Sequence, residues 1–331
     1  MMFEGDFIIP GYYSRFQCKG KACHNCCCHG FYVTLSEKEY FSLHSLDVSK
    51  SLKEKMDGYV GLVENGNPEE YGRIYPDYLG DCPLRLENGY CGLQTEVGEE
   101  KIPSVCRYFP RAPRLYPFPM VSLSLACEWL TEDFFSHPES FSFVHQKLRF
   151  FFDDDETRRE DEKDGAEMKD LISLFSSGSD LTDVLNAMER KYHLEKEFSP
   201  EKDMERLFFL SRVYDERSSM YPYLIKKGKP ESLKEMLKAV EARVSGSYEV
   251  IRKIFINHIL YMNVPFVSSL DREESVYCLV SVFHLFVSFL YQNDVSSEEE
   301  FVRLTSLCFR SFEHSNVYKE LALFYKTKDC E

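Results

Sequence analysis

Apolar residues recur at spacings of three and four through the second half of the chain. This is the pattern of helices that bury one face. The pattern falls on Leu171, Leu174 and Phe175, on Leu207, Leu210 and Val213, and on the ranges 232–261, 276–291 and 298–312. Gly246 lies inside the first of those ranges, so this range is either one helix or two helices interrupted there. The second half is therefore predicted to be helical.

The first part of the chain lacks this periodicity and is rich in proline, as in the segment PRAPRLYPFP at residues 110–119. Proline fixes φ and removes a hydrogen-bond donor, so an irregular, loop-rich region is expected. Residues 152–165 are almost entirely charged and are typical of a surface linker or a solvated helix end. The predicted fold is mainly α, with an irregular cysteine-rich metal-binding N-terminal region (1–151) packed on a helical C-terminal region (166–331).

Composition adds limits on partners and location. A hydrophobic fraction of 44% and a charged fraction of 29% are typical of a globular protein, and the net charge of −15 argues against nucleic-acid binding. The start of the sequence carries acids where a signal peptide needs a basic segment. The longest apolar stretch, 275–291, contains His284 and is short for a membrane span, so a buried core helix is the better interpretation. A cytoplasmic protein with no membrane partner is expected.

Cysteine is concentrated near the start of the chain. Nine of the twelve cysteines lie in the first 127 residues: Cys18, Cys23, Cys26, Cys27, Cys28, Cys82, Cys91, Cys106 and Cys127. Stable disulfides are rare in a reducing cytosol. Nine thiols in one irregular region therefore indicate a metal centre that cross-links this region. Cys278, Cys308 and Cys330 lie far from the others and are expected to be small core residues or isolated thiols.

The spacing of the first cysteine group limits which thiols can share a metal. Adjacent side chains diverge by about 180° on a strand and by about 100° on a helix, so Cys26, Cys27 and Cys28 are not expected to converge on one ion. On a helix, Cys23 and Cys27 would share a face. The later cysteines each stand beside Gly, Pro or another turn residue, where a loop can present a thiolate.

Zinc and an iron–sulfur cluster both remain open as the metal. Structural zinc sites usually show two C-x2-C pairs, and only Cys23 and Cys26 have that spacing. The remaining cysteines stand apart, which favours a cluster whose iron atoms each take one protein ligand. The arrangement C-x3-C-x2-C of radical S-adenosylmethionine enzymes is absent from the sequence.

Several of these motifs resemble a known family. They are Phe16-Gln17-Cys18, Cys23-x3-Cys27-Cys28-x-Gly30-Phe31, Cys82-Pro83-Leu84, Gly89-Tyr90-Cys91, Gly98-Glu99, Cys106-x2-Phe109-Pro110-Arg111 and Leu123-Ser124-Leu125-Ala126-Cys127-Glu128. Fainter similarity continues at residues 256–258, 265–266 and 309–316. The chain resembles the flagellin lysine-N-methylase (FliB) family, and its amino-terminal part resembles YkgJ-type cysteine-cluster proteins.

The resemblance implies an iron–sulfur protein that methylates lysine side chains of flagellin, or of another lysine-bearing protein, with S-adenosylmethionine. It implies a [4Fe–4S] cluster, with zinc as the alternative. The metal ligands that it implies are Cys18, Cys23, Cys27, Cys28, Cys82, Cys91, Cys106 and Cys127. Cys26 is additional to the family pattern and is set aside.

Some polar residues have no role fixed by the sequence. Arg310, Glu313 and His314 share a helix face and form either an interhelical ion-pair set or a wall of an active site. Asn257 and His258 lie in an apolar helix, where satisfied core polar groups are commoner than ligands.

No glycine-rich loop after a strand indicates a methyl-donor site, so no residue is named for it. A non-enzymatic iron–sulfur or zinc protein that acts as a sensor, carrier or interaction module is the alternative to an enzyme.

Overall fold

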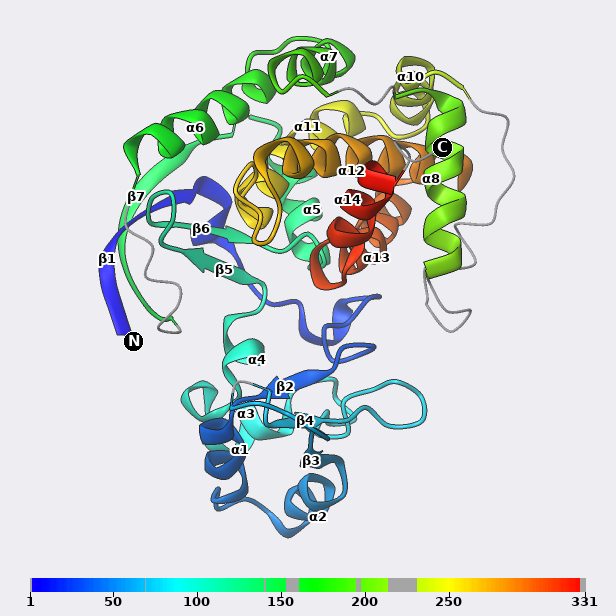
Figure 1. The fold of residues 1–331 in the computed structure, drawn as a ribbon. Helices are drawn as coiled ribbons and strands as arrows, with labels where there is room; N and C mark the ends of the chain where they lie inside the picture. Colours follow the sequence, from blue (N-terminus) through cyan, green and yellow to red (C-terminus); the bar gives the residue numbers. More distant parts are fainter. Residues whose placement is uncertain are drawn as a thin grey trace. The chain divides into compact units, whose positions relative to one another are not determined.

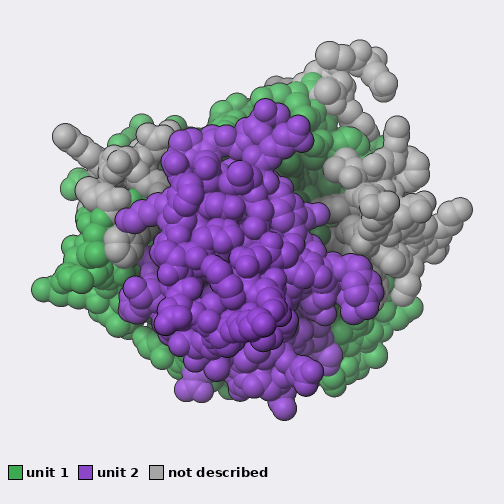
Figure 2. All heavy atoms as spheres, turned by 90° about the horizontal axis from the view of Figure 1, so that it is seen from below, with its two compact units in different colours: residues 1–16, 111–331 green, residues 17–110 purple. Residues whose placement is uncertain are grey.

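A computed structural model describes residues 2–68, 70–139, 141–152, 161–194, 198–213 and 231–327. The chain divides into two compact units, coloured separately in Figure 2: a large unit of residues 1–16 and 111–331, and a small unit of residues 17–110. Cys330 and residues 153–160 of the charged segment lie outside the described residues. The linear boundaries at 151 and 166 therefore stay a prediction.

The large unit contains a four-stranded sheet with the order β5-β6-β1-β7. Its strands are β1 (Met2–Pro10), β5 (Arg111–Arg114), β6 (Met120–Leu123) and β7 (Phe143–Phe151). β1 runs antiparallel to β7 along its whole length and parallel to β6 through Ile8 and Met120. The sequence analysis did not predict this sheet, because each strand is short or only partly alternating and the pairing joins segments far apart in the chain.

Helices make up most of the large unit (Figure 1). They are α5 (Glu128–Ser136), α6 (Glu162–Ser176), α7 (Leu181–Lys191), α8 (Pro200–Val213), α10 (Leu233–Arg243), α11 (Ser247–Met262), α12 (Arg272–Gln292), α13 (Glu298–His314) and α14 (Val317–Thr327). The mainly α prediction is confirmed. Leu171, Phe175 and Leu210 from the predicted apolar stripes are fully buried.

α12 is the core helix of this unit and packs against α7, α8, α10, α13 and α14. By length and composition it could cross a membrane, but 94% of its most apolar stretch is buried inside the protein. The prediction of a core helix at this position is therefore confirmed.

Gly246 separates α10 from α11, so the apolar range 232–261 forms two helices rather than one. Its φ of +84° is a left-handed conformation that glycine adopts without strain, and it is the N-cap of α11. Ser232 begins α10 with a capping box, in which it accepts the Glu235 backbone N–H while the Glu235 carboxylate accepts the Ser232 N–H.

The small unit is built from short elements. They are a 3-10 turn η2 (Gly20–Ala22), β2 (Val33–Leu35), α1 (Glu37–His44), α2 (Lys50–Tyr59), β3 (Val60–Leu62), β4 (Gly72–Ile74), α3 (Gly92–Val97), a 3-10 turn η3 (Glu99–Lys101) and α4 (Ser104–Tyr108). β2, β4 and β3 form an antiparallel sheet. Its buried core is small and consists of Leu35, Leu43, Leu52, Met56, Val60, Ile74, Leu84, Leu93 and Ile102. A unit with so little apolar core needs another source of stability.

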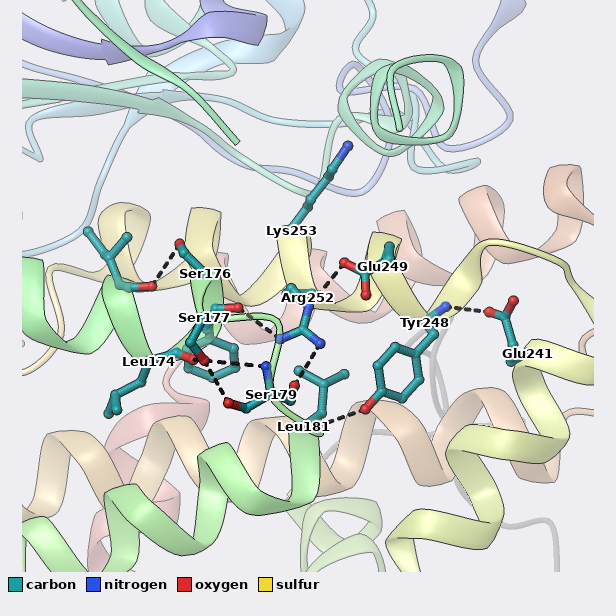
Figure 3. A network of polar contacts seen from close by, with 12 residues as sticks. Leu174, Ser176, Ser177, Ser179, Leu181, Glu241, Tyr248, Glu249, Arg252 and Lys253 are labelled. Atoms are coloured by element: carbon teal, nitrogen blue, oxygen red, sulfur yellow. Dashed lines mark hydrogen bonds and ion pairs between the residues drawn. The ribbon is translucent and has the colours of Figure 1, made fainter. Parts of the chain in front are cut away.

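A buried arginine holds the connection between α6 and α7 in the large unit (Figure 3). Arg252 on α11 donates to the carbonyl oxygens of Phe175 and Ser179, each at 2.8 Å, and so satisfies acceptors at the end of α6. Its Nε also donates to Glu249 at 3.0 Å. The neighbouring Tyr248 hydroxyl accepts the backbone N–H of Leu181 at 2.8 Å, which fixes the start of α7.

Replacing Arg252 with methionine should therefore destabilise the large unit. The change leaves the buried carbonyl of Phe175 without its donor and removes the bond to the Ser179 carbonyl, which lies on an exposed residue, so about 1–3 kcal/mol of unfolding free energy should be lost. The matched control is Arg149→Met, which removes an exposed pair with Glu4 and should cost less than about 0.5 kcal/mol. Urea unfolding followed by circular dichroism measures both, and equal losses would contradict the assigned role of Arg252.

Candidate metal centre

Three consecutive thiols converge in the small unit. The sulfur atoms of Cys26, Cys27 and Cys28 all lie within 4.8 Å of one another. Their backbone is a turn, in which the His29 N–H donates to the Cys26 carbonyl at 3.0 Å and the Cys28 N–H donates to the Cys26 sulfur at 3.4 Å. The divergence expected on a helix or strand is absent because this segment is neither, and Cys26 joins the candidate ligands.

Hydrogen bonds among the three thiols separate their pKa values. The thiols of Cys27 and then Cys28 donate to the sulfur of Cys26, which lowers the pKa of Cys26. Donating to that sulfur raises the pKa of Cys27 and of Cys28. A metal cation favours all three thiolates together, because its charge offsets the repulsion that otherwise keeps two of them protonated.

Backbone pairing brings Cys82 to the same turn. The Cys82 N–H donates to the Cys28 carbonyl at 2.7 Å, and His29 and Asp81 form an isolated β-bridge. The Gly30 N–H donates to the Gly80 carbonyl at 2.8 Å. These bonds explain how cysteines far apart in the sequence become neighbours.

Cys91 follows a tight turn that leads back toward Cys82. Arg85 and Cys91 form a β-bridge, and the Leu86 N–H donates to the Tyr90 carbonyl at 2.8 Å. Gly89 closes this turn with a φ of +86°, and a Cβ there would lie 2.4 Å from the Cβ of Lys21. Only glycine fits both the conformation and the close approach.

The remaining thiols of this group influence one another electrostatically. Burial, followed by the charges of Cys91 and Cys26, raises the pKa of Cys82 to about 11. Desolvation also raises the pKa of Cys106, which lies on α4, and the charges of Cys91, Cys82 and Cys28 add to this effect. Cys82, Cys91 and Cys106 therefore belong to the same electrostatic group as Cys26 and Cys28 of the trio.

The remaining predicted ligands, Cys18, Cys23 and Cys127, lie outside the turn that carries the trio. Cys18 is exposed and its sulfur accepts the Gly20 N–H at 3.4 Å, while Cys23 follows η2. Cys127 belongs to the large unit, where it is the N-cap residue of α5. Across the part of the chain that the structure describes, no second set of three Cys, His, Asp or Glu ligand atoms lies as close together as the trio.

The trio fits a metal by its chemistry and its spacing. Thiolates on one tetrahedral zinc ion lie about 3.8 Å apart, since zinc–sulfur bonds are about 2.3 Å long. Thiolates of an iron–sulfur cluster bind separate iron atoms and lie farther apart. The trio as it stands suits a single ion, whereas a cluster would draw on Cys82, Cys91 or Cys106 as well.

A surface hollow of about 440 Å³ adjoins this centre and has Cys82 in its wall. Its lining carries both signs of charge: the positive residues are Lys21, Lys55 and Arg85, and the negative ones include Asp77 and Asp81. A hollow of this size and polarity can admit a small zwitterionic molecule to the edge of the thiol group.

The arginines that flank Cys106 in the sequence contact aromatic rings. The Arg107 guanidinium lies 4.9 Å from the centre of the Tyr108 ring, and Arg111 in the large unit lies 5.1 Å from that of Phe16. Stacking of this kind contributes about 0.5–1 kcal/mol at exposed sites.

In the large unit, most of the polar residues singled out by sequence make buried hydrogen bonds. The Asn257 amide donates to the Leu123 carbonyl at 2.8 Å and accepts from the Tyr12 hydroxyl, so it is a satisfied core polar group. Glu313 accepts from Ser124 and from His258. The Tyr318 hydroxyl lies 3.0 Å from Nε2 of His258. Sequence reasoning missed Ser124 and Tyr318 as partners, because an isolated hydroxyl carries no pattern that marks its partner.

Part of this chain is similar in sequence to proteins of known name. The chain is 30% identical over 141 residues to a lysine-N-methylase of Salmonella typhimurium, and 29% identical over 141 residues to one of Salmonella choleraesuis. It is also 29% identical over 143 residues to the flagellar biosynthetic protein FliU of Salmonella muenchen. The resemblance to lysine-N-methylases is confirmed.

These matches cover part of each protein. Each spans 42% of this chain, and they span 35% of the two lysine-N-methylases and 82% of FliU. The chain therefore matches about a third of the length of the two lysine-N-methylases. No family model matches the chain, and no solved structure matches it.

Replacing Cys27 with serine should weaken metal binding, because it removes one thiolate of the trio. The affinity for the metal should fall by ~10-fold or more, since even the outer partners of metal ligands contribute that much. Proteolysis within residues 17–110 should rise at the same time, because metal binding and folding are coupled.

The matched control is Cys278→Ser in α12, whose thiol donates to the Tyr318 carbonyl at 3.3 Å, a bond that a serine hydroxyl can also make. Elemental analysis of both purified variants decides the result. Full metal content in the Cys27 variant would remove Cys27 from the ligand set.

Proposed function

We propose that this protein is an S-adenosylmethionine-dependent protein lysine N-methyltransferase that acts on flagellin or another lysine-bearing protein. The observation that carries the proposal is its similarity to proteins named lysine-N-methylase. The name of FliU, a flagellar biosynthetic protein, supports flagellin as the substrate class. The proposal places the protein in the cytoplasm, where its thiols stay reduced and available to a metal.

The proposal includes a metal centre held by thiolates of the small unit, and the group bound there is an iron–sulfur cluster. Cys26, Cys27 and Cys28 would supply the converging ligands, and Cys82, Cys91 and Cys106 are the neighbouring thiols that complete a larger site. Cys18, Cys23 and Cys127 remain proposed ligands by resemblance. Zinc is the second candidate, and the close spacing of the trio favours it.

The metal has a structural role in this proposal. The small unit buries few apolar side chains, and the segments that carry the trio and Cys82 are paired only through a short stretch of backbone hydrogen bonds and the contact of His29 with Asp81. A bound cation would hold these segments together and supply folding free energy that the core lacks. The chain's own contribution is to place the three thiols together at a turn.

Methyl transfer is expected when the purified protein is incubated with S-adenosylmethionine and flagellin. Mass spectrometry should find additions of about 14 Da on lysine side chains, because each methyl group replaces one hydrogen. Flagellin acetylated on its lysines is the control and should gain none, because acetylation blocks the accepting amine. The absence of methyl groups after incubation with fully metal-loaded protein would refute the proposal for flagellin.

The metal should be identified by anaerobic purification followed by analysis for iron, acid-labile sulfide and zinc. Iron and sulfide in equal amounts, about four of each per chain, would support a [4Fe–4S] cluster. Zinc at about one ion per chain with no sulfide would support the second candidate and overturn the cluster. Removal of either metal by a chelator should expose residues 17–110 to proteases.

A further inference from the structure

The hollow beside Cys82 lies wholly within the small unit and has the size of a site for a small molecule. It holds about 440 Å³, and sites for molecules of drug or cofactor size hold about 300–1,000 Å³. One part of its wall is α2, and another is the loop that runs from Asp77 to Gly89. One cofactor-sized molecule therefore has room to bind here.

Hydrogen bonds within the loop after β4 hold it in the shape that forms the hollow. Oδ1 of Asp77 accepts from the Leu79 N–H at 2.9 Å and from the Asp81 N–H at 3.0 Å. Farther along the loop, Nε of Arg85 donates to the Gly89 carbonyl at 3.4 Å. The wall is thus organised before a ligand binds, which lowers the entropic cost of binding.

The positive charges of the lining are only partly neutralised within the protein. Nη1 of Arg85 lies 3.6 Å from Oδ1 of Asp81, so these two side chains form a pair. Lys21 and Lys55 differ from Arg85, because within the part of the chain that is described their side chains form no ion pair or hydrogen bond. Two ammonium groups are therefore available to a ligand that carries a carboxylate.

Two carboxylates of the same lining are also available to a ligand. Glu87 is exposed, and its side chain pairs with no described residue. Asp77 uses Oδ1 to hold the loop, and its Oδ2 accepts no hydrogen bond from a described residue. Both carboxylates favour a ligand that carries positive charge as well as a carboxylate.

Together these charges select a zwitterion. A polyphosphate would be repelled by the acids of the lining, and a polyamine would be repelled by its lysines. Tyr59 lies one helical turn from Lys55 on α2, lines the same hollow and is 37% exposed, so its ring offers a surface on which a base can stack. A ligand with a carboxylate, a cationic group and an aromatic base matches these features.

A second hollow, in the large unit, does not have these properties. It holds about 40 Å³, which is room for a few water molecules. On its wall, Arg15 already pairs with Asp133, and Lys253 donates to the His137 carbonyl. A cofactor-sized zwitterion does not fit there.

From the size, charges and aromatic wall of the hollow in the small unit, we propose that it binds the methyl donor S-adenosylmethionine. Lys21 and Lys55 bind the carboxylate of the donor, and Tyr59 stacks on its adenine. Asp77 and Glu87 face its ammonium and sulfonium charges. This inference rests on the proposed function, and it names the place at which the donor binds, beside the thiol group.

The test measures the binding of S-adenosylmethionine to metal-loaded protein by isothermal titration calorimetry. Lys55→Met should weaken binding about 10-fold, the loss expected when one charge-assisted hydrogen bond to a carboxylate is removed. The matched control is Lys50→Met, because Lys50 lies on the same helix but pairs with Glu54 at the surface. The control should bind the donor as wild type does, and all the proteins should hold the same amount of metal.

A second ligand separates a direct contact from a structural effect. Decarboxylated S-adenosylmethionine keeps the sulfonium and the base but lacks the carboxylate. Wild type should bind it at least about 10-fold more weakly than the complete donor, and Lys55→Met should cause no further loss, because the partner of Lys55 is then absent.

Asp77→Asn provides a test if Lys55→Met fails to fold. The asparagine keeps an oxygen that can accept the two N–H groups of the loop, but it removes the negative charge. It should weaken the binding of both ligands by the same factor, because both carry the sulfonium.

The outcomes are distinct. Equal affinity of wild type and Lys55→Met for the complete donor overturns this inference alone. An equal loss for both ligands in Lys55→Met also overturns it, since that result indicates a structural effect. A wild type that shows the expected binding pattern but methylates no flagellin supports the hollow as the donor site and overturns flagellin as the substrate. A metal-loaded wild type that binds no donor overturns the proposed function and this inference with it.

Discussion

The repulsion that arises among thiolates gathered in a small space is the constraint on which the small unit depends. Cys26, Cys27 and Cys28 lie within 4.8 Å of one another, and Cys82 is tied to them through the backbone. Without a cation, these sulfurs are accommodated by shared protons, because hydrogen bonds from Cys27 and Cys28 lower the pKa of Cys26 and raise the pKa of Cys27. A cation bound to these sulfurs would cross-link the segments that carry them. This cross-link would compensate for the few apolar side chains that the unit buries.

The large unit is stabilised in another way. Its core is continuous from the sheet through α12, and helix ends within it are satisfied by buried polar groups such as Arg252. The free energy gained from such a core can offset the desolvation of a buried carboxylate. Glu313 accepts hydrogen bonds from the Leu125 N–H just after β6 and lies 3.1 Å from Nδ1 of His258 on α11, so its buried charge has partners from two separate segments.

The motifs that resemble lysine-N-methylases fall on both of these features. The cysteine motifs form the thiol group of the small unit, and the motifs around Ser124, His258 and Glu313 form the buried network of the large unit.

The sequence by itself determined the mainly α architecture, the burial of α12 and the cysteine-rich region, because these follow from local periodicity and composition. At Gly246 the sequence left one helix or two open, and the structure decided for two. Only the tertiary structure decided which groups meet. Adjacent thiols converge because Cys26–Cys28 form a turn, a conformation that periodicity does not report. The sheet, and the meeting of Ser124 with His314 across 190 positions, depend on long-range packing that no local pattern encodes.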